Sequence, residues 1–351
     1  MKLKIKMLTL MISCISIASW GGEQRGKKIN NIIVKNQKDK KRIYFRGAPK
    51  LINKIIFETS LDSTIYRPDF CKWDKSGNVY VMDYSTFYIH KFSLVNGTNN
   101  YTHTYFGNGK GKGPGEFVNP TDFDIYNDNI YITDPSNGCI EKYSIKGEYL
   151  ERITLNNNII PQKIEMLDGK ILVTGQRYNG KELFYFYSYD GDFIEGFGDY
   201  IDRTNLNNGV YHDHDIIRIS YNSFCYMPYY LGFMGFYRDG NLQFVRTTID
   251  GLKEVKSVQK EVVKGLYVTK IEKDFETAAE STCNSEYLLL KAVDIKNDKN
   301  YFDLYDINSL EYIKSINGLL PDIYSFSLNG NFLAAIDNNN LYIYDLGKIL
   351  K

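Results

Sequence analysis

The sequence has 351 residues, which is enough for one large β domain or two ordinary domains. Aromatic residues make up 15% of the chain, with 30 Tyr and 20 Phe, and this excess favours β-strands, because aromatic side chains fit a pleated, half-buried surface. The formal net charge is +1, so the chain has no overall electrostatic basis for binding nucleic acid.

Residues 1–18 resemble an export signal peptide. Three lysines lie within residues 2–6, and the apolar run over residues 7–18 is too short to span a bilayer. Two processing events fit this segment. One is cleavage after Ala18, and the other is lipidation of Cys14, because the four residues that end at Cys14 resemble a loose bacterial lipobox. Both alternatives predict an exported protein, either in the periplasm or anchored at the outer membrane as a lipoprotein.

Residues 23–42 are mostly polar and basic and have no clear periodicity, so we expect them to be mobile, as part of a polar leader over residues 19–50. From residue 51 onward, short apolar and aromatic runs alternate with turn dipeptides such as Asp190-Gly191, which supply the positive φ that tight hairpins need. Helical periodicity is nearly absent, and the one candidate helix covers residues 255–265.

A repeated unit organises this β-rich part. Each copy combines an entry residue, often Pro, with an alternating strand, a tight turn, a second strand and, in the clearest copies, a closing Asp. The six copies begin at Pro68, Pro120, Pro161, His214, about Ala278, and Pro321. A third strand follows each copy and most have a fourth, and four strands in roughly 50 residues are typical of one β-propeller blade.

The two ends of this region complement each other. The sixth unit provides strands only over residues 324–328, 332–336 and 341–346, whereas residues 51–60 form a strand that has no blade. If residues 51–60 complete the last blade, the ring closes and its open edges disappear. The sequence therefore predicts an all-β fold over residues 51–351, a six-bladed β-propeller with four-stranded antiparallel blades.

The second unit resembles an NHL repeat. The resemblance is carried by Phe106-Gly107, by Gly113-Pro114-Gly115-Glu116-Phe117, by Asn119-Pro120, by residues 130–134 and 137–143, and by Lys146-Gly147. As a whole the chain is similar to the six-bladed, NHL/TolB-like propeller proteins that are abundant in Bacteroidetes, many of them lipoproteins. This resemblance implies an extracytoplasmic protein, and it offers no catalytic residues to transfer.

The motif His212-Asp213-His214-Asp215 is the sharpest candidate for a functional site in a chain with only four His. Alternate residues of an extended segment point the same way, so His212 and His214 could present two imidazoles to a divalent metal or a substrate. His214 takes the entry position of its unit, near the predicted channel mouth, where propeller lyases that resemble this chain use histidines. Solvated loop residues are the alternative interpretation, because the sequence places no third ligand.

Two other segments are candidates for ligand binding. A Gly-rich loop over residues 107–115 carries Lys110 and Lys112, and its spacing excludes a phosphate-binding loop, so we expect an inter-blade loop that can touch a ligand. Tyr229 and Tyr230 belong to a dense aromatic cluster. Core packing explains most of this cluster, and a few exposed rings could stack on sugars.

Three further features have structural interpretations. Asp83 and Asp134 end the second strands of two units, where a carboxylate can accept hydrogen bonds from the backbone NH groups of the next turn. The four cysteines after Cys14 form no C-x-x-C pair, so we expect free thiols, buried for the three in or beside apolar runs, rather than a metal knuckle. Residues 239–278 exceed the other connections, and we expect a solvated insertion there, with a lid or a docking element for a partner as the alternative.

The sequence favours a non-catalytic binding or scaffold module outside the cytoplasm that presents one loop face to a protein or glycan. The alternative is a propeller lyase or hydrolase with a metal or His-based site at the channel mouth, using His212 or His214. A purely structural envelope protein is a third hypothesis. We expect a monomer that contacts a membrane only through a lipid on Cys14, with no nucleic-acid partner and with a divalent metal only in the enzymatic alternative.

Overall fold

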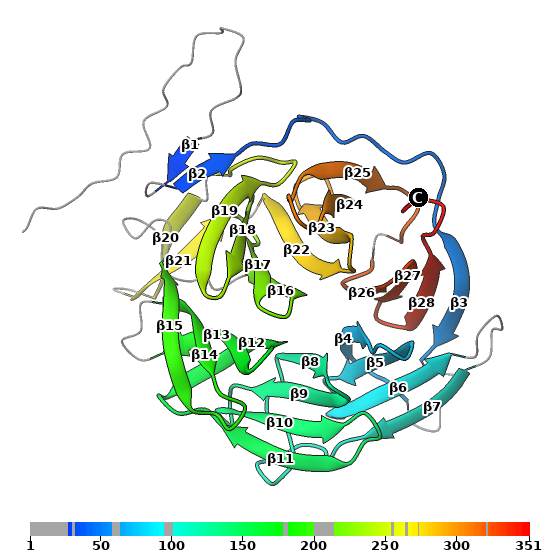
Figure 1. Ribbon diagram of the computed structural model, residues 1–351, viewed down its shortest axis with the longest axis vertical. Coiled ribbons are helices and arrows are strands. Elements are labelled where there is room, and N and C mark those ends of the chain that lie inside the picture. Colours follow the sequence, from blue (N-terminus) through cyan, green and yellow to red (C-terminus); the bar gives the residue numbers. More distant parts are fainter. Residues whose placement is uncertain are drawn as a thin grey trace, which may run out of the picture.

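The computed structural model describes residues 27–29, 32–57, 64–94, 101–177, 182–199, 214–253, 256–263, 266–272, 274–320 and 322–351. In these ranges the regular elements are β-strands, and no helix is long and apolar enough to cross a membrane. Six sheets are arranged around a central axis (Figure 1). The structure confirms the predicted six-bladed propeller.

The first three blades are formed by strands that follow one another in the chain. Their strands, from the axis outward, are β4 (Pro68–Trp73), β5 (Asn78–Asp83), β6 (Tyr88–Leu94) and β7 (Tyr101–Phe106) in blade 1, β8 (Asp122–Tyr126), β9 (Asn129–Asp134), β10 (Cys139–Ser144) and β11 (Tyr149–Thr154) in blade 2, and β12 (Ile159–Leu167), β13 (Lys170–Arg177), β14 (Glu182–Tyr187) and β15 (Phe193–Asp199) in blade 3.

The other three blades repeat this order. Their strands are β16 (His214–Ser220), β17 (Ser223–Pro228), β18 (Phe233–Arg238) and β19 (Asn241–Thr247) in blade 4, β22 (Phe275–Cys283), β23 (Tyr287–Asp294), β24 (Lys299–Asp306) and β25 (Tyr312–Ile316) in blade 5, and β26 (Ser325–Asn329), β27 (Phe332–Ile336), β28 (Asn340–Asp345) and β3 (Lys50–Ile56) in blade 6. Each inner strand touches the inner strands of both neighbouring blades, which closes the ring.

The outer strand of blade 6 comes from the N-terminal part of the chain. β3 pairs antiparallel with β28, and Leu341 lies opposite Ile55 and Ile343 opposite Asn53. This pairing confirms the prediction that residues 51–60 supply the fourth strand of the last blade. Without β3, β28 would be an open sheet edge. The pairing of β3 with β28 covers this edge and joins both ends of the domain in one sheet.

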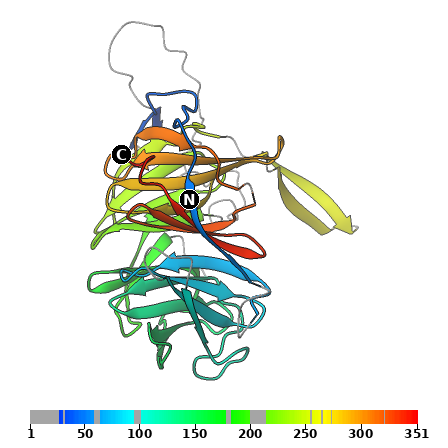
Figure 2. The ribbon, with the colours of Figure 1, turned by 90° about the vertical axis from the view of Figure 1, so that its right-hand side faces the viewer.

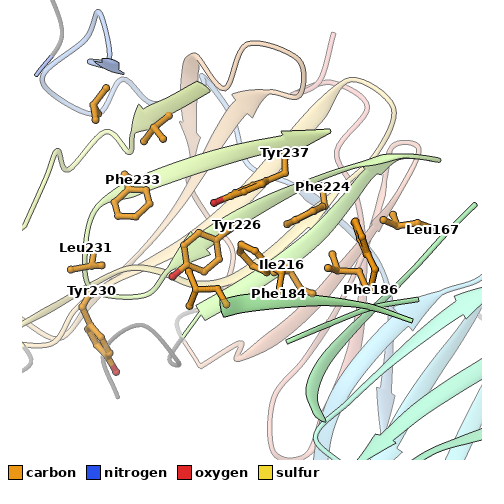
Figure 3. Packing of buried hydrophobic residues seen from close by; sticks show 14 residues of the cluster. Leu167, Phe184, Phe186, Ile216, Phe224, Tyr226, Tyr230, Leu231, Phe233 and Tyr237 are labelled. Carbon is orange, nitrogen blue, oxygen red and sulfur yellow. The ribbon is translucent and has the colours of Figure 1, made fainter. Parts of the chain in front are cut away.

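Aromatic side chains fill the spaces between blades. Between blades 3 and 4, the ring of Phe184 lies 5.2 Å from the rings of Phe224 and Tyr226 and 5.0 Å from that of Tyr237 (Figure 3). Such T-shaped pairs add to the stability that burial itself provides. The packing explains the aromatic excess of the sequence and confirms that most of the cluster that contains Tyr229 and Tyr230 belongs to the core.

The segment before β3 differs from the mobile leader that the sequence predicts. β2 (Ile32–Lys35) pairs in parallel with β19 and antiparallel with β1 (Lys27–Ile29). Further along, the Gln37 amide donates to the carbonyls of Thr247 and Leu310 at 2.7 and 2.8 Å. We call residues 32–49 the strap, because they run along blades 4 and 5 before they reach blade 6 (Figure 1). Polar contacts, the β2–β19 pairing and two widely separated apolar residues, Val34 and Phe45, hold the strap, so it carries no apolar periodicity that a sequence search could detect.

The predicted helix over residues 255–265 is wrong. β20 (Lys256–Val263) and β21 (Leu266–Glu272) instead form an antiparallel hairpin that stands out from the disc (Figure 2). The segment is rich in valine, and β-branched residues favour strands over helices. An insertion between blades 4 and 5 is therefore present, as the sequence predicts.

The cysteines that the structure describes are free thiols. Cys71, Cys139 and Cys225 are buried and Cys283 is partly buried, as expected from their positions in or beside apolar runs. Cys14 and the predicted signal peptide lie outside the described residues.

Candidate functional site

One face of the disc collects the entries of the inner strands. In the antiparallel blades the start of each first strand lies beside the end of the second strand, as Pro68 lies opposite Asp83 and His214 opposite Pro228. The segment before a blade and the turn after its second strand therefore meet at the same end of the channel. We call this end the mouth.

A cavity of about 570 Å³ opens at the mouth, and we call it the mouth cavity. Blades 2, 3 and 4 contribute its walls. The lining residues are Asn119, Thr121, Pro135, Ser136, Ile160, Gln162, Lys163, His214 and Tyr229. Its size lies within the range of small-molecule sites, and most of the lining side chains are uncharged hydrogen-bonding groups.

Asp134 fixes the blade 2 wall of this cavity. Its buried carboxylate accepts hydrogen bonds from the backbone NH groups of Val118, Asn119 and Ser136 at 2.7, 3.2 and 3.1 Å. Asp83 does the same in blade 1, where it accepts from the NH groups of Arg67 and Ser85, both at 2.9 Å. The structure thus confirms the predicted backbone-bracing role of both carboxylates.

His214 and Tyr229 form the blade 4 wall. His214 is 2% exposed and its ring centroid lies 5.3 Å from that of Tyr226. The carbonyl of Tyr229 accepts hydrogen bonds from the backbone NH and the hydroxyl of Thr277, at 2.5 and 3.0 Å. Burial raises the pKa of Tyr229, so its phenol is neutral and can donate a hydrogen bond.

Lys163 separates the mouth cavity from the channel below, since it lines both. Its Nζ lies 3.5 Å from Oδ1 of Asp215 and 5.6 Å from the ring centroid of Phe70. Burial alone would lower the pKa of Lys163, but Tyr229, once it ionises at high pH, and the Asp215 and Asp122 carboxylates hold this pKa well above its ordinary value. The ammonium therefore stays charged at neutral pH.

The channel below the mouth, about 200 Å³ in volume, is lined by ionisable side chains from five of the six inner strands. Arg218 pairs with Asp124 at 2.7 Å, and Lys72 lies 3.6 Å from Asp122 and 4.0 Å from Glu165. The two aspartates also link blade 2 to blade 3, because Asp122 accepts from the NH of Ile164 at 3.0 Å and Asp124 accepts from the NH of Met166 at 2.9 Å.

Two glutamates in the channel are weaker acids than usual. Burial and then Asp124 raise the pKa of Glu165 to about 8, and burial and then Asp215 raise the pKa of Glu280 to about 8. The Ser325 hydroxyl donates to Glu280 at 3.0 Å. Both glutamates therefore keep their protons to a higher pH than an exposed glutamate does.

The other residues predicted to bind a ligand do not line the mouth cavity. Lys110 and Lys112 are exposed on the Gly-rich loop, which Arg152 fixes by donating to the carbonyls of Lys112 and Gly113 at 3.0 and 2.7 Å. Tyr230 is buried, and its hydroxyl donates to Glu276 at 3.2 Å.

The predicted metal site at His212 and His214 stays a prediction. His212 lies outside the described residues, and within the ranges that the structure covers no group of three His, Cys, Asp or Glu residues could hold a metal ion.

Sequence reasoning missed Lys163, Gln162 and Asn119. The repeat alignment contained the signal for two of them, because Gln162 and Lys163 directly follow the entry residue Pro161, just as Asp215 follows the entry residue His214. Positions just after an entry residue thus lie at the mouth cavity, as Gln162 and Lys163 do, or in the channel just below it, as Asp215 does.

No family model and no curated protein matches the chain. Among solved structures, a predicted exported protein of Bacteroides fragilis NCTC 9343 is similar, with a TM-score of 0.59, 11% identity and coverage of 89% of this chain and 98% of its own. Virginiamycin B lyase from Staphylococcus aureus is similar with a TM-score of 0.50, 12% identity and coverage of 84% and 98%. The fold is shared. At these identities the likeness extends no further than the fold.

Proposed function

We propose that this protein is a non-catalytic binding module outside the cytoplasm that recognises a glycan in the mouth cavity. The observation that carries the proposal is the composition of the cavity wall, where amides and hydroxyls of Asn119, Gln162, Ser136 and Tyr229 surround a space of about 570 Å³. A sugar presents many hydroxyl groups, so a wall of uncharged hydrogen-bonding groups suits it better than a mainly apolar wall would.

Tyr229 adds an aromatic ring to this wall. Aromatic side chains offer a flat apolar face and, in tyrosine, a polar edge, which together match a sugar ring. The backbone of Tyr229 is held by Thr277, so the ring is attached to a fixed support. A concave site of this size favours a small ligand or a chain end over a flat protein surface, which buries a larger area.

A titration of the purified protein with a panel of mono- and oligosaccharides tests this proposal. For the sugar that binds most tightly, Tyr229→Ala is expected to weaken binding at least about tenfold, since a stacking ring and a hydrogen bond are lost. Tyr221→Ala is the matched control, because Tyr221 is 68% exposed in the turn between β16 and β17, at the opposite end of the blade. Equal effects of both variants, or binding that is insensitive to Tyr229, would refute the cavity as the binding site.

A lyase or hydrolase is the second candidate function. The specific observation that favours it is that His214, Tyr229 and Lys163, three side chains able to transfer protons, line the same cavity. The likeness to a lyase adds only that this fold accommodates such chemistry. Metal analysis of the purified protein, together with turnover measurements on a His212→Ala/His214→Ala pair, separates the two functions. Bound sugar that is recovered unchanged, with no metal, supports the binding module.

Export and anchoring form part of the proposal. The signal-like residues 1–18 support export, and the lipobox-like residues before Cys14 support a lipoprotein in the outer membrane, with a periplasmic protein cleaved after Ala18 as the alternative. We propose a monomer that binds no nucleic acid. Mass spectrometry of the mature N-terminal peptide distinguishes a diacylated Cys14 from a start at residue 19, and size-exclusion chromatography with light scattering tests the monomer.

A further inference from the structure

We infer that the ligand of the mouth cavity is an acidic sugar, whose carboxylate binds the ammonium group of Lys163. The inference rests on the proposed function and narrows it from glycans in general to polyhydroxylated ligands that carry a carboxylate.

The distribution of charge around Lys163 supports this ligand class. Among the described residues that line the mouth cavity, Lys163 has the only side chain that is always charged at neutral pH, and none is a carboxylate. The channel carboxylates lie on the other side of Lys163; Asp122, Asp215 and Glu280 line the channel but not the cavity. Among the residues that the structure describes, a ligand in the cavity therefore meets one ammonium and no competing carboxylate.

Lys163 is available to such a ligand because its present ion pair is long. The distance of 3.5 Å to Asp215 exceeds the 2.7–2.9 Å that is typical of a charge-assisted hydrogen bond between an ammonium and a carboxylate. A ligand carboxylate above Lys163 can approach to that shorter distance. The loosely held ammonium then gains a closer partner on the cavity side.

Asp215 does not depend on Lys163 alone. Its Oδ2 accepts a hydrogen bond from the hydroxyl of Ser281 at 2.5 Å, and its Oδ1 accepts one from the backbone NH of Ile216 at 3.1 Å. When the Lys163 ammonium turns toward a ligand, Asp215 keeps two partners. The movement therefore leaves no bare buried carboxylate, which would otherwise oppose binding.

The remaining wall recognises the sugar part of the ligand. Gln162 precedes Lys163 in β12, and Tyr229 lines the same cavity. Hydroxyl groups next to the carboxylate of an acidic sugar can form hydrogen bonds with these side chains. Simple carboxylates such as acetate have no hydroxyl groups and cannot form them. The site therefore distinguishes an acidic sugar both from its neutral counterpart and from a small organic acid.

Isothermal titration calorimetry at pH 7 with matched ligands tests the inference. The pairs are glucuronate with glucose and galacturonate with galactose, with acetate and glucosamine as further probes. We expect the acidic member of at least one pair to bind at least about tenfold more tightly than its neutral partner, which corresponds to one unit in log Kd. Raising the salt concentration is expected to reduce this preference, since it screens the ion pair.

Substitutions assign the preference to one residue. Lys163→Met is expected to abolish the preference for the acid while weak binding of the neutral sugar remains. Lys110→Met is the matched control, because Lys110 is an exposed lysine outside the cavity, and it should leave the preference unchanged. Lys163→Gln serves as a second variant that keeps a hydrogen-bond donor, and thermal midpoints check that all three variants are folded.

The outcomes separate this inference from the proposed function. Equal affinity for acidic and neutral sugars, with binding still sensitive to Tyr229, would overturn the inference and leave the proposed function standing. Tighter binding of glucosamine or of acetate than of the uronates would also overturn it. If no sugar binds to the wild-type protein, both the inference and the proposed function fail.

Discussion

Arg42→Ala tests whether the strap is part of the folded domain or an accessory tail. The Arg42 guanidinium donates to both carboxylate oxygens of Asp250, at 2.9 and 2.6 Å, and to both oxygens of Asp303, at distances of 2.7 to 3.1 Å. It also lies 3.9 Å from the ring centroid of Tyr301. One side chain of the strap thus connects the end of blade 4 with a middle strand of blade 5.

The expected cost follows from the burial of this cluster. The side chains of Arg42, Asp250 and Asp303 are 13%, 9% and 1% exposed. Burial raises the pKa of Asp303 and Arg42 lowers it. Removing Arg42 therefore leaves a buried carboxylate whose remaining close partner, among the residues that the structure describes, is Ser315. Removing one partner from a buried ion pair costs about 3–5 kcal/mol. At about 2 °C per kcal/mol for a large domain, the unfolding midpoint should fall by roughly 6–10 °C.

Differential scanning calorimetry provides the measurement, and Lys38→Ala provides the control. Lys38 is also in the strap and pairs with Glu311 at 2.9 Å, but its side chain is 79% exposed. An exposed pair of this kind contributes about 0–1 kcal/mol, so the midpoint of Lys38→Ala should hardly move. If Arg42→Ala shifts the midpoint no more than Lys38→Ala does, the strap does not stabilise the propeller and this reasoning is refuted.

Three further predictions concern the blades and the channel. Asp134→Ala and Asp83→Ala should each lower the free energy of unfolding by about 1–3 kcal/mol, because each leaves partly buried hydrogen bonds to backbone NH groups without their carboxylate acceptor. Only Asp134→Ala should weaken ligand binding, since only Asp134 holds cavity residues; urea unfolding and calorimetry check this. Burial, and then the neighbouring His103, lower the pKa of His90 from 6.5 to about 4, so the unfolded state binds more protons than the folded state between these two pH values. The free energy of unfolding should therefore fall by up to about 3 kcal/mol as the pH drops from 6.5 to 4. His90→Phe should flatten this part of the plot of urea midpoint against pH, and an unchanged slope would contradict the assignment. The pKa of Glu280 is about 8 in the folded state against 4.5 when unfolded, so the folded state binds more protons between these two pH values. The free energy of unfolding should therefore fall as the pH rises from 4.5 through 8. Glu280→Gln should reduce that fall, as measured by urea unfolding at a series of pH values.

The architecture was accessible from the sequence because it repeats. Entry residues such as Pro120 and closing residues such as Asp134 recur at similar spacing, and each recurrence adds support to the same blade. The closure by β3 was also predictable, since a blade with three strands and a strand without a blade complete each other. The bracing role of Asp134 could be predicted because an Asp also ends the second strand of blade 1, at Asp83.

The strap and the cavity were harder to predict, for different reasons. The strap is held by the pairing of β2 with β19, by the buried Val34 and by polar side chains such as Gln37 and Arg42. Their partners lie more than 200 residues away, and such contacts leave no local pattern. The cavity wall combines residues from three blades, so the repeat alignment indicates the place of Lys163 but not that it lines one cavity with Tyr229. His214 was found because histidine is rare in this chain, which is a signal of composition and not of geometry.

A crystal structure of the protein with the tightest-binding sugar is the most direct test of the account. We predict density for the sugar in the mouth cavity, with its ring against Tyr229 and a carboxylate within hydrogen-bonding distance of Nζ of Lys163. Density for the sugar at the Gly-rich loop around Lys110, on the outer edges of the blades, or along the β20–β21 hairpin, with the mouth cavity holding only water, would contradict it.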